Sequence, residues 1–268
     1  MFERLLEEYQ AVNTSLCMMD RSELCLSTQE ITSMREVVSL LKPFEEVTRE
    51  LSSDKYVSIS KIIPIARGLQ RLTMDCVSAH PLKNELLVSM NRRYTNMEQN
   101  YMLAASTLLD PRFKKLAFGD QAVCNQAVQR MTTELAAALQ QSEQEQLITP
   151  SQIDVPAECP PNVWSIIDER VTASVMTRPP TSTAISTLRS YFEQPNIVRK
   201  ESPLVWWKRQ VGVFPFLCNF AKKFLSIPGT SVPSERVFSK AGELISQRRS
   251  RIKSKHVDMM LFLNKNLI

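Results

Sequence analysis

The sequence predicts a mainly α-helical chain, and three observations support this fold class. Its 268 residues include only 5 glycines, and glycine-poor chains favour helix over tight-turned sheet. Apolar residues recur at spacings of three and four along most of the chain. No segment alternates convincingly between apolar and polar residues, as half-buried strands do. The length suits one large domain or two small ones.

Composition and charge exclude several functional classes. The chain is 43% hydrophobic and 23% charged, an ordinary globular composition. Its net charge of +5 is mildly basic, so the location of the charge matters more than its sum. The 6 cysteines form no CxxC pair and there are only 2 histidines, so no zinc finger and no metal site are predicted. No run is apolar enough to span a bilayer, and scattered cysteines without a secretory leader favour the cytosol or nucleus.

The N-terminal part is predicted to be a series of amphipathic helices. The first starts directly in helical periodicity at residue 2, without a cap. Ser27 or Thr28 starts a second helix, and Glu30 lies in its first turn. Pro43 interrupts or kinks this helix, and its apolar stripe continues beyond the proline.

Prolines also indicate where the next helices begin. A third helix carries Pro64 in its first turn, and Pro81 opens a fourth. Residues 102–109 form a mainly apolar run that fits a buried strand or a buried helix; their length and alanine content favour a helix. Residues 121–139 are rich in alanine, glutamine and methionine and are predicted to be helical.

The character of the sequence changes after this helix. Residues 140–161 are polar, acidic and proline-bearing, which predicts a flexible linker. A short helix at about 164–176 and a second linker at 178–183 follow, and 184–192 form one more short helix. The predicted segments are a helical region at 1–139, a linker with a short helix at 140–183, and a C-terminal region at 184–268.

Aromatic residues gather in the C-terminal region. A helix at 204–213 carries two adjacent tryptophans, and Pro215 opens the next, where phenylalanines recur every four residues beside Leu217 and Ala221. Each aromatic side chain can bury on the order of 150–250 Å². We expect core and dimer-interface roles for Trp206, Trp207, Phe214, Phe216 and Leu217 and, in the terminal run, for Met260, Leu261 and Leu263.

The following helix begins with a carboxylate. Thr230 or Ser231 can cap it, and Pro233 is tolerated in its first turn. Glu235 lies in the same turn, where the helix dipole favours a negative charge by about 0.3–1 kcal/mol. This effect explains Glu235 without any function, and on spacing alone it is the preferred explanation.

A basic cluster and an apolar run complete the chain. The cluster contains five cations and no acid: Arg248, Arg249, Arg251, Lys253 and Lys255. It fits a solvated loop or a contact with a phosphate backbone, and both interpretations stay open. The run from Met259 to Leu263 is apolar all round, so it is expected to be buried beneath the domain or against a partner subunit.

The terminal stretch SIPGTSVPSERVFSKAGELISQRRSRIKSKHVDMMLFLNKN resembles the C-terminal dimerisation region of hAT (hobo/Activator) transposases and their BED-finger domesticated relatives. The family pattern has a tryptophan element, an L-x-I-P turn, S-E-R-x-F-S, a basic R-R-x-R-[LI] and an apolar run ending in asparagine. All are present here. Residues 40–65 and 107–116 also resemble the family's helical insertion region.

This resemblance implies a mechanism that the chain does not complete. In the family, two aspartates before the helical insertion and one glutamate after it hold the divalent metal of an RNase H-like domain. Glu235 aligns with that glutamate, whereas the aspartates and the zinc finger are expected upstream of Met1. Asp110 is interpreted as a helix-boundary cap. No cofactor is therefore expected for this chain; Mg or Mn is expected only if a longer parent protein holds all three acids.

We therefore predict the helical insertion region followed by the C-terminal helices of a truncated RNase H-like fold. The leading hypothesis is a non-catalytic homodimerisation module of an hAT-derived nuclear DNA-binding protein. The alternative is the C-terminal part of an active metal-dependent transposase, with Glu235 as the third acid. DNA binding through the basic cluster is a third hypothesis, and a helical core without a partner remains open for 1–139.

Overall fold

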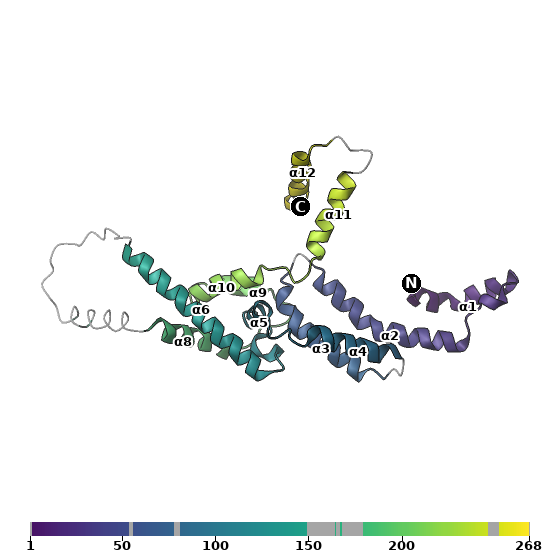
Figure 1. The fold of residues 1–268 in the computed structure, drawn as a ribbon, viewed down its shortest axis with the longest axis horizontal. Helices are drawn as coiled ribbons and strands as arrows, with labels where there is room; N and C mark the ends of the chain where they lie inside the picture. Colours follow the sequence, from purple (N-terminus) through teal and green to yellow (C-terminus); the bar gives the residue numbers. More distant parts are fainter. Residues whose placement is uncertain are drawn as a thin grey trace. The chain divides into compact units, whose positions relative to one another are not determined.

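The computed structural model describes residues 2–53, 56–77, 81–148, 179–245 and 252–267, together with Trp164 and Ile167; at 143–148 it describes the backbone only. Every regular element within these ranges is a helix, and none is a strand (Figure 1). The mainly α prediction is confirmed for them, and the RNase H-like assignment stays a prediction. None of the described helices has the length and apolar character needed to cross a bilayer.

The chain divides into two compact units. Unit 1 comprises Met1–Met97 and Pro228–Ile268, and unit 2 comprises Glu98–Ile227. Unit 2 is therefore inserted into unit 1 in sequence. This division rests on packing. The segments at 1–139, 140–183 and 184–268 rest on sequence character and stay a prediction.

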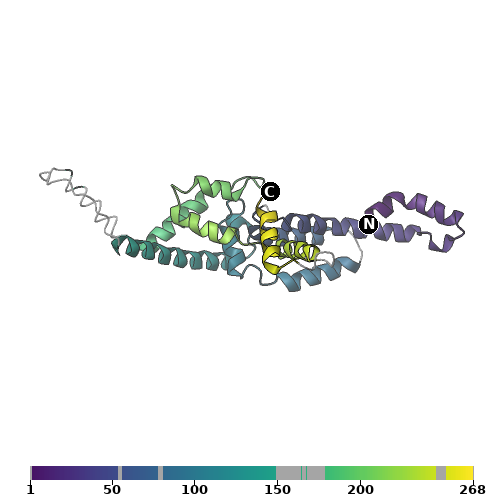
Figure 2. The ribbon, with the colours of Figure 1, turned by 90° about the horizontal axis from the view of Figure 1, so that it is seen from above.

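The N-terminal helices of unit 1 pack in sequence order. They are α1 (Phe2–Met18), α2 (Thr28–Leu51), α3 (Ile62–Asp75) and α4 (Pro81–Tyr94), with short 3-10 helices η1 (Ser22–Leu24) and η2 (Ile59–Lys61) between them. Each α-helix contacts the next, and α2, α3 and α4 lie side by side (Figure 2). Their buried apolar side chains are Ile31, Leu40, Val57, Ile59, Ile63, Ala66, Leu69 and Met90.

Local sequence signals determine where these helices begin. Ser27 caps α2: its Oγ accepts the Glu30 amide at 3.3 Å, and the Glu30 carboxylate accepts the Ser27 amide at 2.8 Å. The Ser27 amide, and then the Ser27 hydroxyl at 2.7 Å, donate to the Glu30 carboxylate and lower its pKa. The predicted start is confirmed, as are Pro64 in the first turn of α3 and Pro81 at the start of α4. Pro43 lies inside α2, which continues to Leu51, so the proline does not end the helix.

A glycine fixes the turn that returns the chain to unit 1. The amide of Gly229 donates to Ser58 Oγ at 2.9 Å, and the Thr230 hydroxyl donates to the carbonyl of Leu51 at 3.4 Å. A Cβ at position 229 would lie 2.9 Å from the Ser58 carbonyl carbon and 3.0 Å from the Ile59 nitrogen. Both atoms belong to the main chain and cannot rotate away, so this close approach requires glycine.

Unit 2 is built around a short central helix. Its helices are α5 (Tyr101–Leu108), η3 (Lys114–Ala117), α6 (Gln121–Ile148), α8 (Pro180–Glu193), α9 (Pro203–Arg209) and α10 (Pro215–Leu225). Helix α5 packs against α6 and α10, and α8 packs against α6 (Figures 1 and 2). Ala104, Ala105, Leu108 and Leu109 are fully buried, which confirms the predicted buried helix at 102–109.

Several predicted boundaries in unit 2 differ from the structure. Helix α8 begins at Pro180, inside the predicted linker at 178–183, and α9 ends at Arg209, short of the predicted end at 213. Helix α6 continues to Ile148, so the first part of the predicted linker is helical. The predicted helix at 164–176 lies outside the described residues, except for Trp164 and Ile167, which are helical.

The buried face of α10 differs from the predicted phenylalanine stripe. Phe224 is buried, whereas Phe216 and Phe220 are half-buried. The rest of the buried face is Leu217, Cys218, Ala221 and Leu225.

Candidate functional site

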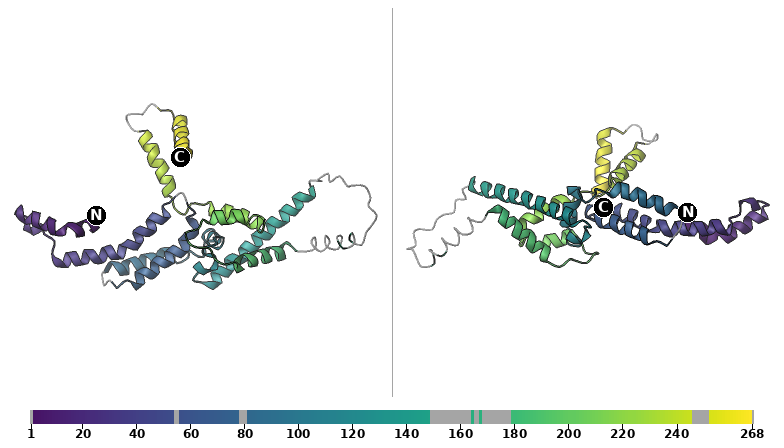
Figure 3. Two further views of the ribbon diagram at one scale, coloured as in Figure 1. Left: turned by 180° about the vertical axis from the view of Figure 1, so that it is seen from behind. Right: turned by 60° about the horizontal axis from the view of Figure 1, so that its bottom comes forward.

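The last two helices form a hairpin with an apolar surface. Helix α11 (Val232–Leu244) and helix α12 (Ser254–Asn266) pack against each other (Figure 3). No residue of α11 is buried, and Val257 is the one buried residue of α12. Phe238 is 74% exposed and Phe262 is 66% exposed. The other exposed apolar side chains of the hairpin are Ile245, Met259, Met260, Leu263 and Leu267. The terminal run predicted to be buried on every side is therefore mostly exposed within the described chain, with Leu261 half-buried.

A groove lies between the two helices of this hairpin. Its volume is about 400 Å³, and its lining comprises Lys240, Glu243, Leu244, Met260, Leu261 and Asn264. Lys240 Nζ on α11 donates to Asn264 Oδ1 on α12 at 2.8 Å, which joins the two walls. Two of the predicted interface residues, Met260 and Leu261, line this groove, and Leu263 is 46% exposed.

Glu235 lies in the first turn of α11, as predicted, and is exposed. Ser231 occupies the N-cap position, but its side chain accepts no backbone amide; its hydroxyl instead donates to the Glu235 carboxylate. Across the described residues, no three His, Cys, Asp or Glu side chains gather as they would around a metal ion. A metal-binding role for Glu235 stays a prediction.

The structure places two of the five predicted DNA-binding cations. Lys253 is the N-cap residue of α12 and Lys255 lies in its first turn, and both are exposed. Arg248, Arg249 and Arg251 lie outside the described residues. The dipole of a helix disfavours positive charge at its N-terminus, so Lys253 and Lys255 do not stabilise α12 through their charge. They are available to an external anion.

Aromatic rings form a cluster around Tyr191 inside unit 2, and the ring of the neighbouring Phe192 lies 5.2 Å from that of Tyr191. The ring centroids of Trp207 and Tyr191 lie 5.1 Å apart, and Trp206 meets Trp207 edge-on at 4.8 Å. Phe214 meets Tyr191 edge-on at 6.3 Å. The predicted interface residues Trp207, Phe214 and Leu217 are buried within their own chain, whereas Trp206 and Phe216 are half-buried.

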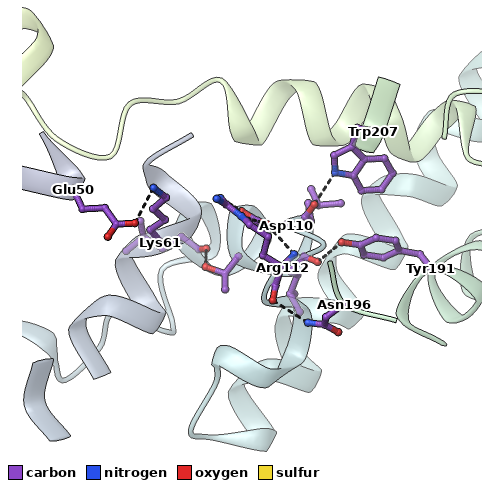
Figure 4. A network of polar contacts seen from close by, with 11 residues as sticks. Glu50, Lys61, Asp110, Arg112, Tyr191, Asn196 and Trp207 are labelled. Carbon is purple, nitrogen blue, oxygen red and sulfur yellow. Dashed lines mark hydrogen bonds and ion pairs between the residues drawn. The ribbon is translucent and has the colours of Figure 1, made fainter. Parts of the chain in front are cut away.

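Two side chains of this aromatic cluster donate hydrogen bonds to the last carbonyls of α5 (Figure 4). Trp207 Nε1 donates to the carbonyl of Leu109 at 2.8 Å, and the Tyr191 hydroxyl donates to the carbonyl of Leu108 at 3.0 Å. The last carbonyls of a helix have no partner within the helix, and leaving them unpaired in a core is costly. Burial raises the pKa of the Tyr191 hydroxyl well above its ordinary value, and the charge of Asp110 raises it further.

A buried ion pair shapes the turn that follows α5 (Figure 4). Asp110 is fully buried, and its Oδ2 lies 2.6 Å from Arg112 Nη2. Its Oδ1 accepts the Arg112 amide at 3.0 Å and Nε at 2.9 Å. Asp110 thus lies at a helix boundary, as predicted, and its carboxylate holds the turn through Arg112. Asn196 Nδ2 then donates to the Arg112 carbonyl at 3.0 Å.

Lys114 connects this turn to the end of α8. Its Nζ donates to the carbonyl of Tyr191 at 2.8 Å and to that of Gln194 at 2.6 Å, and it lies 4.7 Å from the Tyr191 ring centroid. A cation at a helix C-terminus is favoured by the dipole. Lys114 is 3% exposed and adopts φ of 48°, and burial lowers its pKa to about 8.

Sequence reasoning missed Lys114, Tyr191 and Asn196. Lys114 lies within 107–116, a segment noted for its resemblance only, and a lysine beside another lysine normally indicates a solvated surface. One sequence signal could have indicated an aromatic cluster at Tyr191: it lies in a short helix that precedes the two tryptophans in the sequence. Asn196 had none, because its role depends on a turn 84 residues away.

Comparison with known proteins identifies the C-terminal part. Residues 187–267 match the hAT family C-terminal dimerisation region. The whole chain is 27% identical to human zinc finger BED domain-containing protein 4, covering 23% of that protein. It is 26% identical to mouse zinc finger BED domain-containing protein 6, covering 30% of it. Over 90% of its length, it is 24% identical to the putative transcriptional regulator tpeD of Talaromyces stipitatus, covering 27% of that protein.

The predicted resemblance of the C-terminal stretch is thereby confirmed, whereas the likeness of 40–65 and 107–116 to an insertion region stays a prediction. The chain spans less than a third of the length of these relatives. The matched region starts within α8, includes the tryptophan pair and ends at the close of α12. It therefore contributes α9 and α10 to unit 2 and the α11–α12 hairpin to unit 1. The matched region is thus not a separate packing unit.

Proposed function

We propose that this chain, which matches an hAT family dimerisation region at residues 187–267, is a self-association module and that the α11–α12 hairpin carries the contact. The observation that carries this proposal is the apolar surface of the hairpin within a region matched to dimerisation. Exposed apolar patches of this kind are typical of protein interaction sites. In a two-fold dimer the same patch faces itself, so each copy covers the residues that the other exposes.

The predicted interface residues then divide into two roles. Met260, Leu261 and Leu263 lie on or beside the groove of the hairpin and are assigned to the contact. Trp207 and Phe214 are buried in unit 2, so they are assigned to the internal support of the matched region. Side chains that are already buried cannot add apolar area to a contact between subunits.

Light scattering coupled to size exclusion tests the contact. Phe262→Glu places a carboxylate on the exposed face of α12, and burying it unpaired at an interface is costly. The dimer dissociation constant should rise by roughly 100-fold or more. Leu116→Glu is the matched control, because Leu116 is 81% exposed and lies in unit 2. A wild-type chain that is monomeric at micromolar concentration contradicts the proposal, as does a Phe262→Glu variant with unchanged dimerisation.

We further propose that the parent protein is a transposase-derived nuclear DNA-binding protein. Two relatives are named for a BED zinc finger, and a third is described as a putative transcriptional regulator. Within this chain, the exposed Lys253 and Lys255 support phosphate contact. Binding to duplex DNA should weaken with salt, with a logarithmic slope of about −0.9 per phosphate contacted.

Single substitutions resolve this DNA contact. Lys253→Ala and Lys255→Ala should each reduce the salt slope by about 1 if each lysine contacts one phosphate. Lys200→Ala is the control, since Lys200 is exposed and lies in unit 2. Binding that is independent of salt, or equally sensitive to Lys200→Ala, contradicts a phosphate contact at the start of α12.

We propose that the chain does not cut DNA by itself, a proposal supported by its match to a dimerisation region. The second candidate is that Glu235 supplies one metal-binding acid to a longer transposase. Incubation of the chain with DNA and Mg²⁺ or Mn²⁺ should leave the DNA uncut. If a longer parent does cut, Glu235→Gln should abolish cleavage and leave dimerisation unchanged, which would support the second candidate.

A further inference from the structure

Two cysteine thiols face each other in the connection between α1 and α2. The Sγ atoms of Cys17 and Cys25 lie 3.6 Å apart. Cys17 lies in the last turn of α1, and Cys25 follows η1 and precedes the N-cap of α2. The two residues are eight positions apart in sequence, so this proximity results from the fold of the connection.

The side chain of Asn13 on α1 holds the segment next to Cys25 in place. Asn13 Nδ2 donates to the carbonyl of Leu26 at 3.1 Å, and the Leu26 amide donates to Asn13 Oδ1 at 3.0 Å. The Cys25 thiol also lies 3.6 Å from the carbonyl of Asn13. Asp20 has φ of 54°, in the left-handed region, where the chain turns back. These contacts order the connection that carries Cys25, and forming the bond requires the two sulfurs to approach from 3.6 Å to about 2.0 Å.

The two thiols differ in accessibility. Cys17 is exposed and Cys25 is half-buried, whereas Cys124 and Cys218 are buried. Burial raises the pKa of the Cys25 thiol, and the adjacent Cys17 raises it further. An external oxidant therefore reaches Cys17 first, and Cys25 is placed to attack the oxidised sulfur.

We propose that Cys17 and Cys25 form a redox pair that closes to a disulfide when the chain meets hydrogen peroxide. The Cys17 sulfur attacks one peroxide oxygen, the O–O bond breaks, and a sulfenic acid and water are produced. The Cys25 sulfur then attacks the sulfenic sulfur; the S–O bond breaks, and the hydroxide leaves as water with the Cys25 proton. In total, two thiols and one peroxide give one disulfide and two waters, and the thiols lose two electrons.

The disulfide would covalently join the end of α1 to the start of α2. No residue of α1 is buried, so few apolar contacts hold this helix in place. A cross-link removes chain freedom from the detached state. Oxidation should therefore slow amide hydrogen exchange in α1, and reduction by dithiothreitol should restore it.

The tryptic map of the chain tests the pair directly. Arg4, Arg21 and Arg35 are consecutive cleavage sites, so Cys17 and Cys25 fall in the separate peptides 5–21 and 22–35. After peroxide treatment, blocking of free thiols and non-reducing digestion, these peptides should appear as one linked species, with a mass about 2 Da below their sum. Dithiothreitol should separate them.

Variants complete the test. Cys17→Ser and Cys25→Ser should each abolish the linked species, and Cys76→Ser, at a half-buried cysteine elsewhere in unit 1, should leave it unchanged. Cys17 accumulating as sulfinic acid beside a free Cys25 overturns the proposal. A peptide 5–21 linked to a second copy of itself also overturns it. The same holds if hydrogen exchange in α1 slows equally in Cys25→Ser.

Discussion

The indole nitrogen of Trp207 donates to the main-chain carbonyl of Leu109 at 2.8 Å, across 98 residues of sequence. Both residues are buried, with Leu109 fully so. The bond joins the tryptophan element of the matched dimerisation region to the end of α5, which that region does not include. The fold of the dimerisation region therefore depends on residues well outside it.

Trp207→Phe tests this bond because it keeps a large ring and removes the donor. The Leu109 carbonyl would be left unpaired in the core, and the free energy of unfolding should fall by about 1–3 kcal/mol. Urea unfolding followed by circular dichroism measures the change. Trp206→Phe is the control, because Trp206 is only half-buried. Equal losses in both variants would contradict a special role for the indole nitrogen.

Tyr191 should make the chain sensitive to alkali. Burial, and then the charge of Asp110, raise the folded-state pKa of its hydroxyl well above 10. A group whose pKa is raised on folding contributes stability that is complete below its unfolded value and is lost at higher pH. The free energy of unfolding should thus fall with a steeper slope above about pH 10. In Tyr191→Phe that slope should be shallower; an unchanged slope would disprove the assignment.

Titration of Lys114 should change the stability with pH in the opposite direction to that of Tyr191. Burial lowers its pKa from 10.5 to about 8 on folding, so between these values the unfolded state binds more protons. Stability should therefore rise with pH over this window, until tyrosine ionisation reverses the trend. Lys114→Met removes the titrating group, and its urea midpoint should lack the rise between pH 8 and 10. A rise that persists in this variant must come from another group.

The backbone of Lys114 allows a second test at the same position. Its φ of 48° costs a residue with a Cβ roughly 1 kcal/mol and costs glycine little. Lys114→Ala and Lys114→Gly lose the same ammonium group and its hydrogen bonds. The glycine variant should be the more stable of the two by about 1 kcal/mol, the reverse of the usual order in helices. Thermal unfolding of the pair measures this difference, and a more stable alanine variant would contradict the left-handed backbone.

Gly229 offers a comparison among glycines. Gly229→Ala would drive a methyl group into the main chain at Ser58 and Ile59, and should cost about 2 kcal/mol or more. Gly68 and Gly242 are helical and have open space where a Cβ would lie, so their alanine variants should gain up to about 1 kcal/mol. If all three variants behave alike in thermal unfolding, the close approach at Gly229 does not exist in solution.

Local signals made much of the helical structure predictable. The capping box at Ser27 and Glu30, and the prolines that open α4 and α10, act over a single helical turn and can be identified in the sequence alone. The buried helix α5 was distinguishable from a strand by its length and alanine content. The end of α6 was not predicted, because glutamine and glutamate suit both a polar helix and a linker.

The polar contacts of unit 2 were beyond prediction because they depend on which distant segments meet. Nothing near Lys114 in sequence indicates that its ammonium group lies against carbonyls 77 and 80 residues away. The terminal run from Met259 to Leu263 shows the reverse, because there the sequence predicted burial that the described chain does not provide. Its apolar composition predicts burial, yet Val257 is the one residue of α12 that the described chain buries. Periodicity predicts that a surface needs burial, but not which molecule supplies it.

The insertion of unit 2 between the two parts of unit 1 has a consequence for the order of biosynthesis. A ribosome completes residues 98–227 before it starts the return segment at Pro228. Unit 2 can therefore fold while its chain is still growing, as domains generally do. Unit 1 cannot be completed at that stage, because the Ser58 hydroxyl is made early and its partner, the Gly229 amide, is made only after unit 2. A nascent chain stalled in unit 2 therefore presents the N-terminal part of unit 1, up to Met97, without its return segment.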